Sequence, residues 1–188
     1  MRSSYLAFGL LLLLLSSIHS QPLTPPLSPG EKVIGIAESF AGTKEATGNN
    51  DGAAVEMFLH SVGLKKGTSW CGAFVSYCLT KAEVKEPKIR SGLARHFKKG
   101  KNLILANEVL RGAKSVPIGS LVGWEKGNTI YGHIGFVKTW KQQTGVTIEG
   151  NTSSGVSGSQ SNGDGVYVRS RSIQPANYFR IMWFVPVE

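Results

Sequence analysis

The sequence is short of acidic residues, of cysteine and of long hydrophobic runs. It has 12 Asp and Glu against 21 Lys and Arg, which gives a formal net charge of +9 at pH 7. A basic chain suits a polyanionic neighbourhood such as a cell wall, a membrane surface or a nucleic acid. Charge alone does not choose among these, because a basic surface also simply keeps a protein soluble.

No apolar run is long enough to cross a bilayer, which needs roughly 20 residues. The apolar run Tyr5–Leu15 follows a short basic start and precedes small polar residues at 16–20. This three-part pattern is typical of a secretory signal. We therefore expect residues 1–20 to be a signal peptide with no transmembrane segment after its cleavage. The protein would be exported, to the periplasm or to the cell exterior and cell wall.

The rest of the chain predicts one domain. Residues 21–29 hold four prolines and indicate an extended linker. Removing residues 1–20 takes away one arginine and no acidic residue, so 20 basic and 12 acidic side chains remain, a net charge of +8. Residues 30–188 show no internal repeat and are numerous enough to bury one core.

Helical spacing comes first in this domain and strand-like alternation follows. Ser28 to Glu31 form a capping box that should begin a first helix. Asn50 or Asp51 should cap a second helix and Ser69 a third. After Pro117 come five short strand-like runs: Ser120–Trp124, His133–Trp140, Val146–Gly150, Val166–Arg171 and Arg180–Val187. We expect an α+β domain, with N-terminal helices packed on an antiparallel sheet or half-barrel of about five or six strands.

The two cysteines, Cys71 and Cys78, lie in the same predicted helix and cannot pair. Seven residues along a helix separate their Cα atoms by about 10 Å, whereas a disulfide needs less than about 7 Å. A free thiol in an exported protein is unusual and indicates either burial or catalysis. Cys78 should pack in the core. Cys71 lies in the first helical turn, where the helix dipole favours the nucleophilic thiolate.

A histidine and a carboxylate can be brought together at one end of a predicted hairpin. His133 begins one strand and Glu149 ends the next, so pairing through the 141–145 turn puts them at the same end. A one-residue slip would flip the side chains; a three-residue loop would put both on one face, and Asn151 shares the parity of Glu149. Packing the Cys71 helix there would join a nucleophile, a base and an orienting group.

Such a site also needs donors for an oxyanion. The backbone N–H of Cys71, at a helix start, is a natural donor. The sequence does not identify the second donor, for which the backbone of Ser69 or Trp70 is a guess. Each residue also has a plain structural explanation, since an isolated cysteine usually packs in the core and a lone strand histidine is usually structural.

Three segments together resemble the motifs of the CHAP family, the cysteine, histidine-dependent amidohydrolases/peptidases. They are Ser69–Val75, Gly132–Val137 and Ile148–Thr152, and the Thr47–Gly52 turn and the Pro117–Val122 strand entry are similar too. The resemblance covers nearly all of the predicted domain. It implies a papain-like fold and hydrolysis of peptidoglycan amide bonds, as an amidase or endopeptidase, through a thioester. It also implies that Cys71 is the nucleophile, His133 the base, Glu149 the group that orients the histidine and Asn151 an accessory polar group.

We expect no cofactor and no metal. One Cys, one His and one Glu have no standard zinc-ligand spacing. Some similar proteins bind calcium through acidic residues just before the cysteine, and residues 64–69 contain none. The basic stretch Arg90–Lys101 has one aromatic residue and no repeating pattern, so we interpret it as a solvated face that could meet an anionic substrate, and we expect no nucleic-acid partner.

Two alternatives stay open at this point. One is a non-catalytic wall-binding or structural module on the same fold, since fold alone does not prove function. The other is an exported wall-degrading toxin, which would bring an immunity or inhibitor protein as a partner. In the leading hypothesis the protein is a monomer whose partner is peptidoglycan. The bond that it cleaves cannot be read from the sequence; the 90–101 stretch and the Gly/Ser-rich segment 151–165 would shape the groove.

Overall fold

The computed structural model describes residues 25–127, 129–155, 163–173 and 180–188. The predicted signal peptide and the first part of the predicted linker lie outside these residues. Within the described residues no helix is long and apolar enough to span a membrane.

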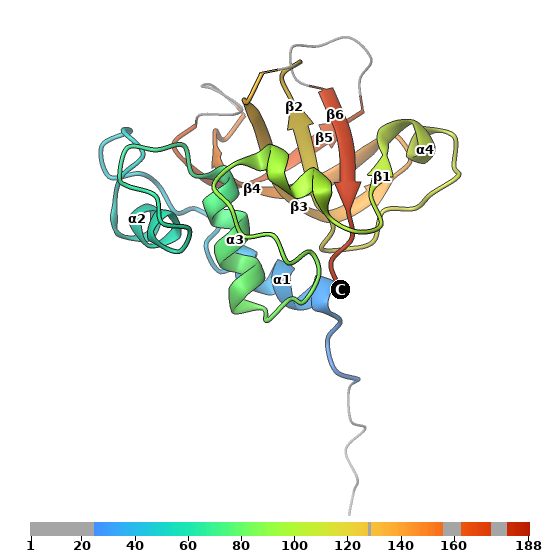
Figure 1. Ribbon diagram of the computed structural model, residues 1–188, viewed down its shortest axis with the longest axis horizontal. Coiled ribbons are helices and arrows are strands. Elements are labelled where there is room, and N and C mark those ends of the chain that lie inside the picture. The colour runs from blue at the N-terminus through green and yellow to red at the C-terminus, as the bar shows by residue number, and fades with distance from the viewer. Residues whose placement is uncertain (1–24, 128, 156–162, 174–179) are drawn as a thin grey trace, which may run out of the picture.

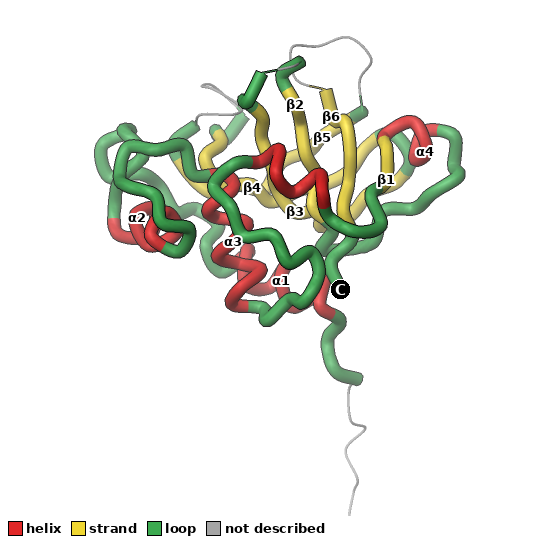
Figure 2. Tube along the Cα trace, viewed as in Figure 1, coloured by secondary structure: helices red, strands yellow, loops and turns green. Residues whose placement is uncertain are grey.

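Four α-helices and one 3-10 helix form in the described part of the chain. They are α1 (Pro29–Glu38), α2 (Ala53–His60), α3 (Cys71–Lys81), η1 (Ala94–Lys99) and α4 (Ala106–Leu110). The predicted capping box begins α1, with the Ser28 side chain accepting from the Glu31 N–H and Pro29 as the first helical residue. Figure 1 shows α1, α2 and α3 gathered on one side of a curved sheet and the short helix α4 at the sheet's other end. The long stretch from α3 to residue 121 is mostly loop, interrupted by η1, by the short strand at 104–105 and by α4 (Figure 2).

One antiparallel sheet of six strands is seen in the described residues, in the order β1-β6-β2-β3-β4-β5. The strands are β1 (Ile104–Leu105), β2 (Leu121–Glu125), β3 (Gly132–Lys141), β4 (Thr144–Thr152), β5 (Gly165–Ser172) and β6 (Arg180–Val185). The predicted α+β class and the number of strands are confirmed. The two-residue strand β1 and the helix α4 were not predicted, because elements this short carry no periodic pattern.

The sheet separates two apolar clusters. Alternating strand residues face opposite sides, so Leu121 and Phe136 join the larger cluster under α1 to α3, and their neighbours Val122 and Val137 join the smaller one. Phe74 of α3 lies in the larger cluster, with its ring centroid 5.4 to 6.5 Å from those of Phe40, Phe58, Trp70 and Phe136. These contacts hold α3 on the sheet.

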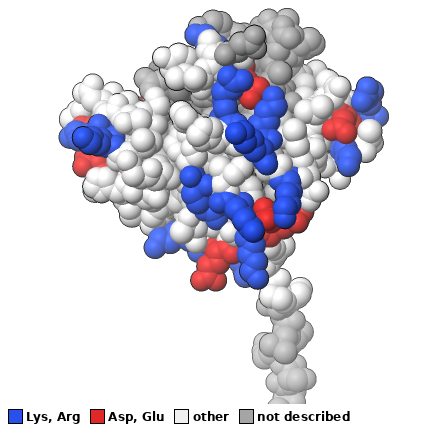
Figure 3. Space-filling model, in the orientation of Figure 1, with Lys and Arg blue, Asp and Glu red and all other residues white. Residues whose placement is uncertain are grey.

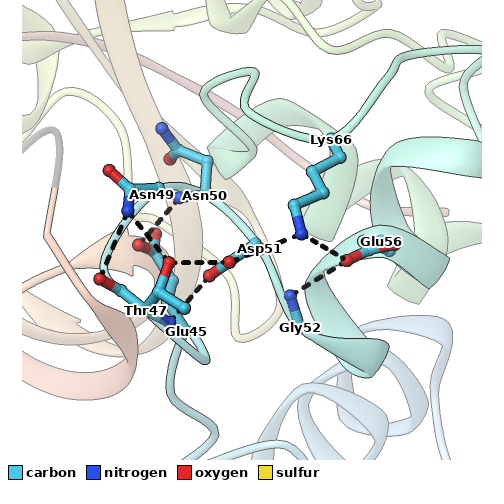
Figure 4. Close-up of polar contacts among 8 residues, drawn as sticks. All are labelled: Glu45, Thr47, Asn49, Asn50, Asp51, Gly52, Glu56 and Lys66. Carbon is cyan, nitrogen blue, oxygen red and sulfur yellow. Dashed lines mark hydrogen bonds and ion pairs between the residues drawn. The ribbon is translucent and has the colours of Figure 1, made fainter.

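The predicted N-caps of α2 and α3 are wrong. For α2, hydrogen bonds within the preceding turn explain the difference. Asp51 does not cap α2; its carboxylate accepts from the N–H of Thr47 at 2.9 Å and from the Thr47 hydroxyl at 2.7 Å, so it closes the preceding turn instead (Figure 4). Gly52 is the N-cap of α2, and the Glu56 carboxylate accepts from its N–H. Trp70, not Ser69, is the N-cap of α3.

Close packing at Gly123 of β2 gives a test of this fold. A Cβ at Gly123 would lie 1.9 Å from the ring of Trp183, which covers it. We expect Gly123→Ala to lower the free energy of unfolding by about 1–3 kcal/mol, the usual effect of overpacking a core. Urea unfolding followed by circular dichroism measures it.

Gly35→Ala is the matched control. Gly35 lies in the interior of α1 and nothing stands within 4 Å of its would-be Cβ. Alanine there should raise the free energy of unfolding by about 0.5–1 kcal/mol, because the unfolded chain loses freedom. Equal effects of the two substitutions would contradict the packing described.

Candidate active site

Cys71 is the first residue of α3 and lies at the meeting point of helix and sheet. It is buried, with 4% of its surface exposed. The first hydrogen bond of the helix joins the Phe74 N–H to the Trp70 carbonyl at 2.8 Å, so the N–H of Cys71 has no partner within the helix. The next residue, Gly72, lies under the Gly92 carbonyl, which would be 2.4 Å from a Cβ. The segment around Gly92 therefore borders the start of the helix.

His133 and Glu149 lie on one face of the β3–β4 hairpin, for a different reason from the one predicted. The turn has two residues, since Lys141 pairs with Thr144, and such a turn pairs odd-numbered with even-numbered positions. The register then shifts between Val137 and Thr139. Lys138 is the extra residue of this bulge. Beyond it, odd-numbered residues pair with odd-numbered ones, as Val137 does with Thr147, so His133 and Glu149 share a face. The bulge therefore supplies the parity that we had assigned to a three-residue loop.

A glycine opens the path between the two side chains. The His133 Nε2 lies 3.0 Å from the Glu149 Oε2. Glu149 stands opposite Gly135, and a Cβ there would be 2.5 Å from the Glu149 Cγ. The carboxylate can cross to His133 because position 135 has no side chain. Of the two glycines near His133, Gly132 and Gly135, it is Gly135 that lets the Glu149 side chain reach the histidine.

Arg171 of β5 holds the other side of the Glu149 carboxylate, and the sequence had not singled it out. Its Nε donates to Oε1 at 2.7 Å and its Nη2 donates to Oε2, a bidentate pair. The Thr147 hydroxyl also donates to Oε1. The guanidinium lies 5.3 Å from the ring centroid of Trp124, whose ring is in turn 5.5 Å from that of His133. Arg171, Glu149, His133 and Trp124 thus form a closed ring of contacts. The four residues come from the four adjacent strands β5, β4, β3 and β2.

The charges in this buried site shift both pKa values. Burial disfavours the charged form of His133, but the hydrogen bonds and charges of Cys71 and Glu149 outweigh it and raise the pKa of His133 to about 9. Burial likewise disfavours the Glu149 anion, but Arg171 and His133 outweigh it and lower the pKa of Glu149 to about 2. Both groups therefore favour their charged forms at neutral pH.

Cys71 lies close enough to His133 to help raise the pKa of its imidazole. Because Nε2 faces Glu149, Nδ1 is the nitrogen left for the thiol, and it has no conventional hydrogen-bond partner among the described residues. Cys71, His133 and Glu149 thus lie at one junction of helix and sheet. An imidazolium beside a thiol favours the thiolate.

Asn151 lies at the same junction but contacts backbone rather than His133. With its amide oriented so that both ends are satisfied, its oxygen accepts from the Trp70 N–H at 3.0 Å and its nitrogen donates to the Gly163 carbonyl at 3.0 Å. Asn151 is buried and has a positive φ of 55°, a conformation that asparagine tolerates. The Trp70 N–H is therefore engaged, which removes it from the two oxyanion donors that we had considered beside Cys71.

The basic stretch that we had interpreted as a solvated face is largely tied to the protein. Lys and Arg side chains gather over the middle of one face of the molecule (Figure 3). Arg90 donates to the carbonyls of Val84 and Pro87, and Lys98 of η1 binds Glu125 at 2.9 Å.

In the described part of the chain, no group of three or more His, Cys, Asp or Glu side chains could hold a metal ion.

The pKa shift of His133 predicts how stability depends on pH. A pKa raised from 6.5 to about 9 in the folded state adds stability that is complete below about pH 6.5 and is lost as the pH rises through about 9. We expect His133→Gln to flatten the fall in the free energy of unfolding across that window, by at most about 1.4 kcal/mol per pH unit. Urea unfolding at several pH values measures the slope.

His60→Gln is the control, because His60 is an exposed histidine at the end of α2. Its slope should match that of the unaltered protein. If the free energy of unfolding of His133→Gln fell with pH as steeply as that of the unaltered protein, the His133–Glu149 ion pair would be contradicted.

The comparisons agree with this geometry. The model of the CHAP domain family matches residues 63–151, a span that contains Cys71, His133, Glu149 and Asn151. No curated protein and no solved structure matches the chain. CHAP domains are generally cysteine- and histidine-dependent amidohydrolases. The match over residues 63–151, a little under half of the chain, supports membership of the CHAP domain family.

Proposed function

We propose that this protein is an exported cysteine hydrolase that cleaves amide bonds in peptidoglycan through a thioester intermediate. One observation carries the proposal: the buried His133 imidazole lies 3.0 Å from a Glu149 carboxylate oxygen, and the Cys71 thiol at a helix start lies near enough to help raise its pKa. Family membership supports the reaction class, and peptidoglycan is the substrate class that the family implies. The secretory pattern of residues 1–20 and the net charge of +9 support an exported protein with an anionic polymer as its partner.

The first half of the reaction forms the thioester. The Cys71 thiolate attacks the carbonyl carbon of the amide, and the carbonyl oxygen takes up negative charge. The C–N bond then breaks, and the His133 imidazolium gives its proton to the departing amine nitrogen. The amine leaves with this proton, the acyl group stays on the sulfur, and His133 becomes neutral.

The second half releases the acid. Neutral His133 takes a proton from a water molecule, which attacks the thioester carbonyl carbon. The C–S bond breaks, the sulfur leaves as a thiolate, and the imidazolium beside it is the one that began the cycle. Glu149 keeps the imidazole in place throughout by accepting from Nε2, so that Nδ1 stays directed to the sulfur and the reacting atoms.

The helix start provides part of the oxyanion site. The Cys71 N–H is free of intrahelical bonding, and a backbone N–H at a helix N-terminus stabilises a developing oxyanion. Asn151 holds the neighbouring peptide by accepting from the Trp70 N–H at 3.0 Å. This contact holds the peptide that comes just before the one carrying the Cys71 N–H. Asn151 thus acts on the site by positioning the backbone.

Replacing the nucleophile tests the proposal. Cys71→Ala should abolish the clearing of purified peptidoglycan, because no thioester can form, while circular dichroism shows retained folding. Removal of a nucleophile of this kind lowers kcat by about 10⁴-fold or more. The measurement is the turbidity of a peptidoglycan suspension, with mass spectrometry of the released fragments to identify the new amine end and so the bond.

Cys78→Ala is the matched control, because Cys78 is a second thiol in the same helix. Burial raises the pKa of the Cys78 thiol, which keeps it protonated and unreactive. This variant should clear peptidoglycan like the unaltered protein. Clearing by Cys71→Ala at the unaltered rate would refute the mechanism, and an unaltered protein that binds peptidoglycan without releasing fragments would favour the non-catalytic alternative.

A further inference from the structure

We propose that Arg171 is a positioning residue of this site, which fixes the Glu149 carboxylate and supplies the positive charge that balances it. The inference rests on the proposed cysteine chemistry, and it extends that chemistry to a residue on the edge strand β5, outside the span that the family model matches. The contacts described above join Arg171 to Glu149 and to the ring of Trp124. It would act on Cys71 and His133 through Glu149.

The contact geometry is the first step of the argument. An arginine that bonds both oxygens of a carboxylate fixes its plane as well as its position. Arg171 does so with Nε on Oε1 and Nη2 on Oε2. Thr147 adds a third donor, and His133 the fourth contact. The carboxylate therefore has one orientation, and the Glu149–His133 hydrogen bond transmits that orientation to the imidazole.

Burial makes the charge of Arg171 important. The Glu149 side chain is 0% exposed and that of Arg171 is 15% exposed, so water screens the pair weakly. With a thiolate and an imidazolium present, Cys71, His133, Glu149 and Arg171 together carry no net charge. Without Arg171 the remaining three groups would carry a net charge of −1. That charge would oppose the thiolate and bind the imidazolium proton more tightly.

Other charged groups face the site from the elements packed around it. Arg169 of β5 acts on Glu149 through charge. Arg95 of η1 approaches Gly132, beside His133, and is paired with Glu125 of β2 at 3.5 Å. Lys98 of η1 also binds Glu125. Arg171 makes two hydrogen bonds to the carboxylate that holds His133.

The plainer explanation is that Arg171 only joins β5 to β4. Such a staple would affect stability, whereas a positioning residue also affects protonation and the chemical step. Arg171→Met removes both the charge and the hydrogen bonds. Arg171→Lys keeps the charge and loses the bidentate geometry. Arg111→Met removes an arginine that is exposed at the end of α4 and serves as the control.

The first readout is the titration of His133, followed by NMR of the labelled imidazole in the free protein and assigned with His133→Gln. We expect the midpoint in Arg171→Met to rise by about one pH unit or more, because a buried cation is lost. Arg171→Lys and Arg111→Met should keep the midpoint of the unaltered protein. An unchanged midpoint in Arg171→Met would overturn the proposal, even if that variant unfolds more easily.

The second readout is peptidoglycan hydrolysis as a function of pH. Groups that orient a histidine from behind typically change activity by 10- to 100-fold, so we expect kcat of Arg171→Met to fall by about that factor with KM unchanged. Its acid limb should move to higher pH, whereas Arg171→Lys should keep the limb and recover part of kcat. A fall confined to substrate affinity would contradict a positioning role.

The two readouts separate this inference from the proposed function. If the unaltered protein does not hydrolyse peptidoglycan while the His133 midpoint shifts as stated, the proposed function fails and the role of Arg171 stands. If Arg171→Met does not fold, Arg171→Lys decides, since the proposal requires an unaltered midpoint together with a lowered kcat. Full activity in the lysine variant would overturn it.

Discussion

The site depends on one close contact, that between the start of α3 and the end of β4. Gly150 lies against the rings of Trp70 and Phe74, and a Cβ at Gly150 would stand 2.7 Å from either ring. Because residue 150 has no side chain, the backbone of β4 can pack directly against these two rings. The residue before it, Glu149, then reaches His133, and the residue after it, Asn151, reaches the Trp70 N–H. Three consecutive residues therefore join the sheet to the helix, and their order explains the Glu-Gly-Asn segment.

The electrostatics of the site follow from this burial. Charged groups taken from water are costly unless they are paired and hydrogen-bonded. Here each oxygen of Glu149 accepts two hydrogen bonds, from Arg171 on both and from Thr147 and His133 on one each. The pKa of Glu149 is lowered to about 2 in spite of burial. An ionised carboxylate held in one place keeps the His133 imidazole in one orientation, which the proposed mechanism requires.

The sequence predicted the parts of the fold that have strong local signals. The capping box of α1, the strand pattern after residue 117 and the place of Cys71 in the first turn of α3 depend on neighbouring residues, and they were right. His133 and Glu149 do lie together on the predicted hairpin. The reason differs from the predicted three-residue loop, because the structure uses a bulge, and a bulge has no signature in a single sequence. Arg171 was missed for a related reason. An arginine in an edge strand usually faces solvent, and only the pairing of β5 with β4 turns it toward Glu149.

The bulge matters because it decides which side of the sheet carries the chemistry. Without the extra residue, His133 and Glu149 would lie on opposite faces, one of them directed into the apolar cluster under the helices. The side chain of the extra residue, Lys138, leaves the sheet and pairs with Glu38 at the end of α1. Both partners are partly exposed, so the ion pair contributes little stability by itself. A hairpin slipped by one residue would place a different residue opposite α1 and would break this ion pair. The bulge therefore joins the first helix to the hairpin that carries His133 and Glu149.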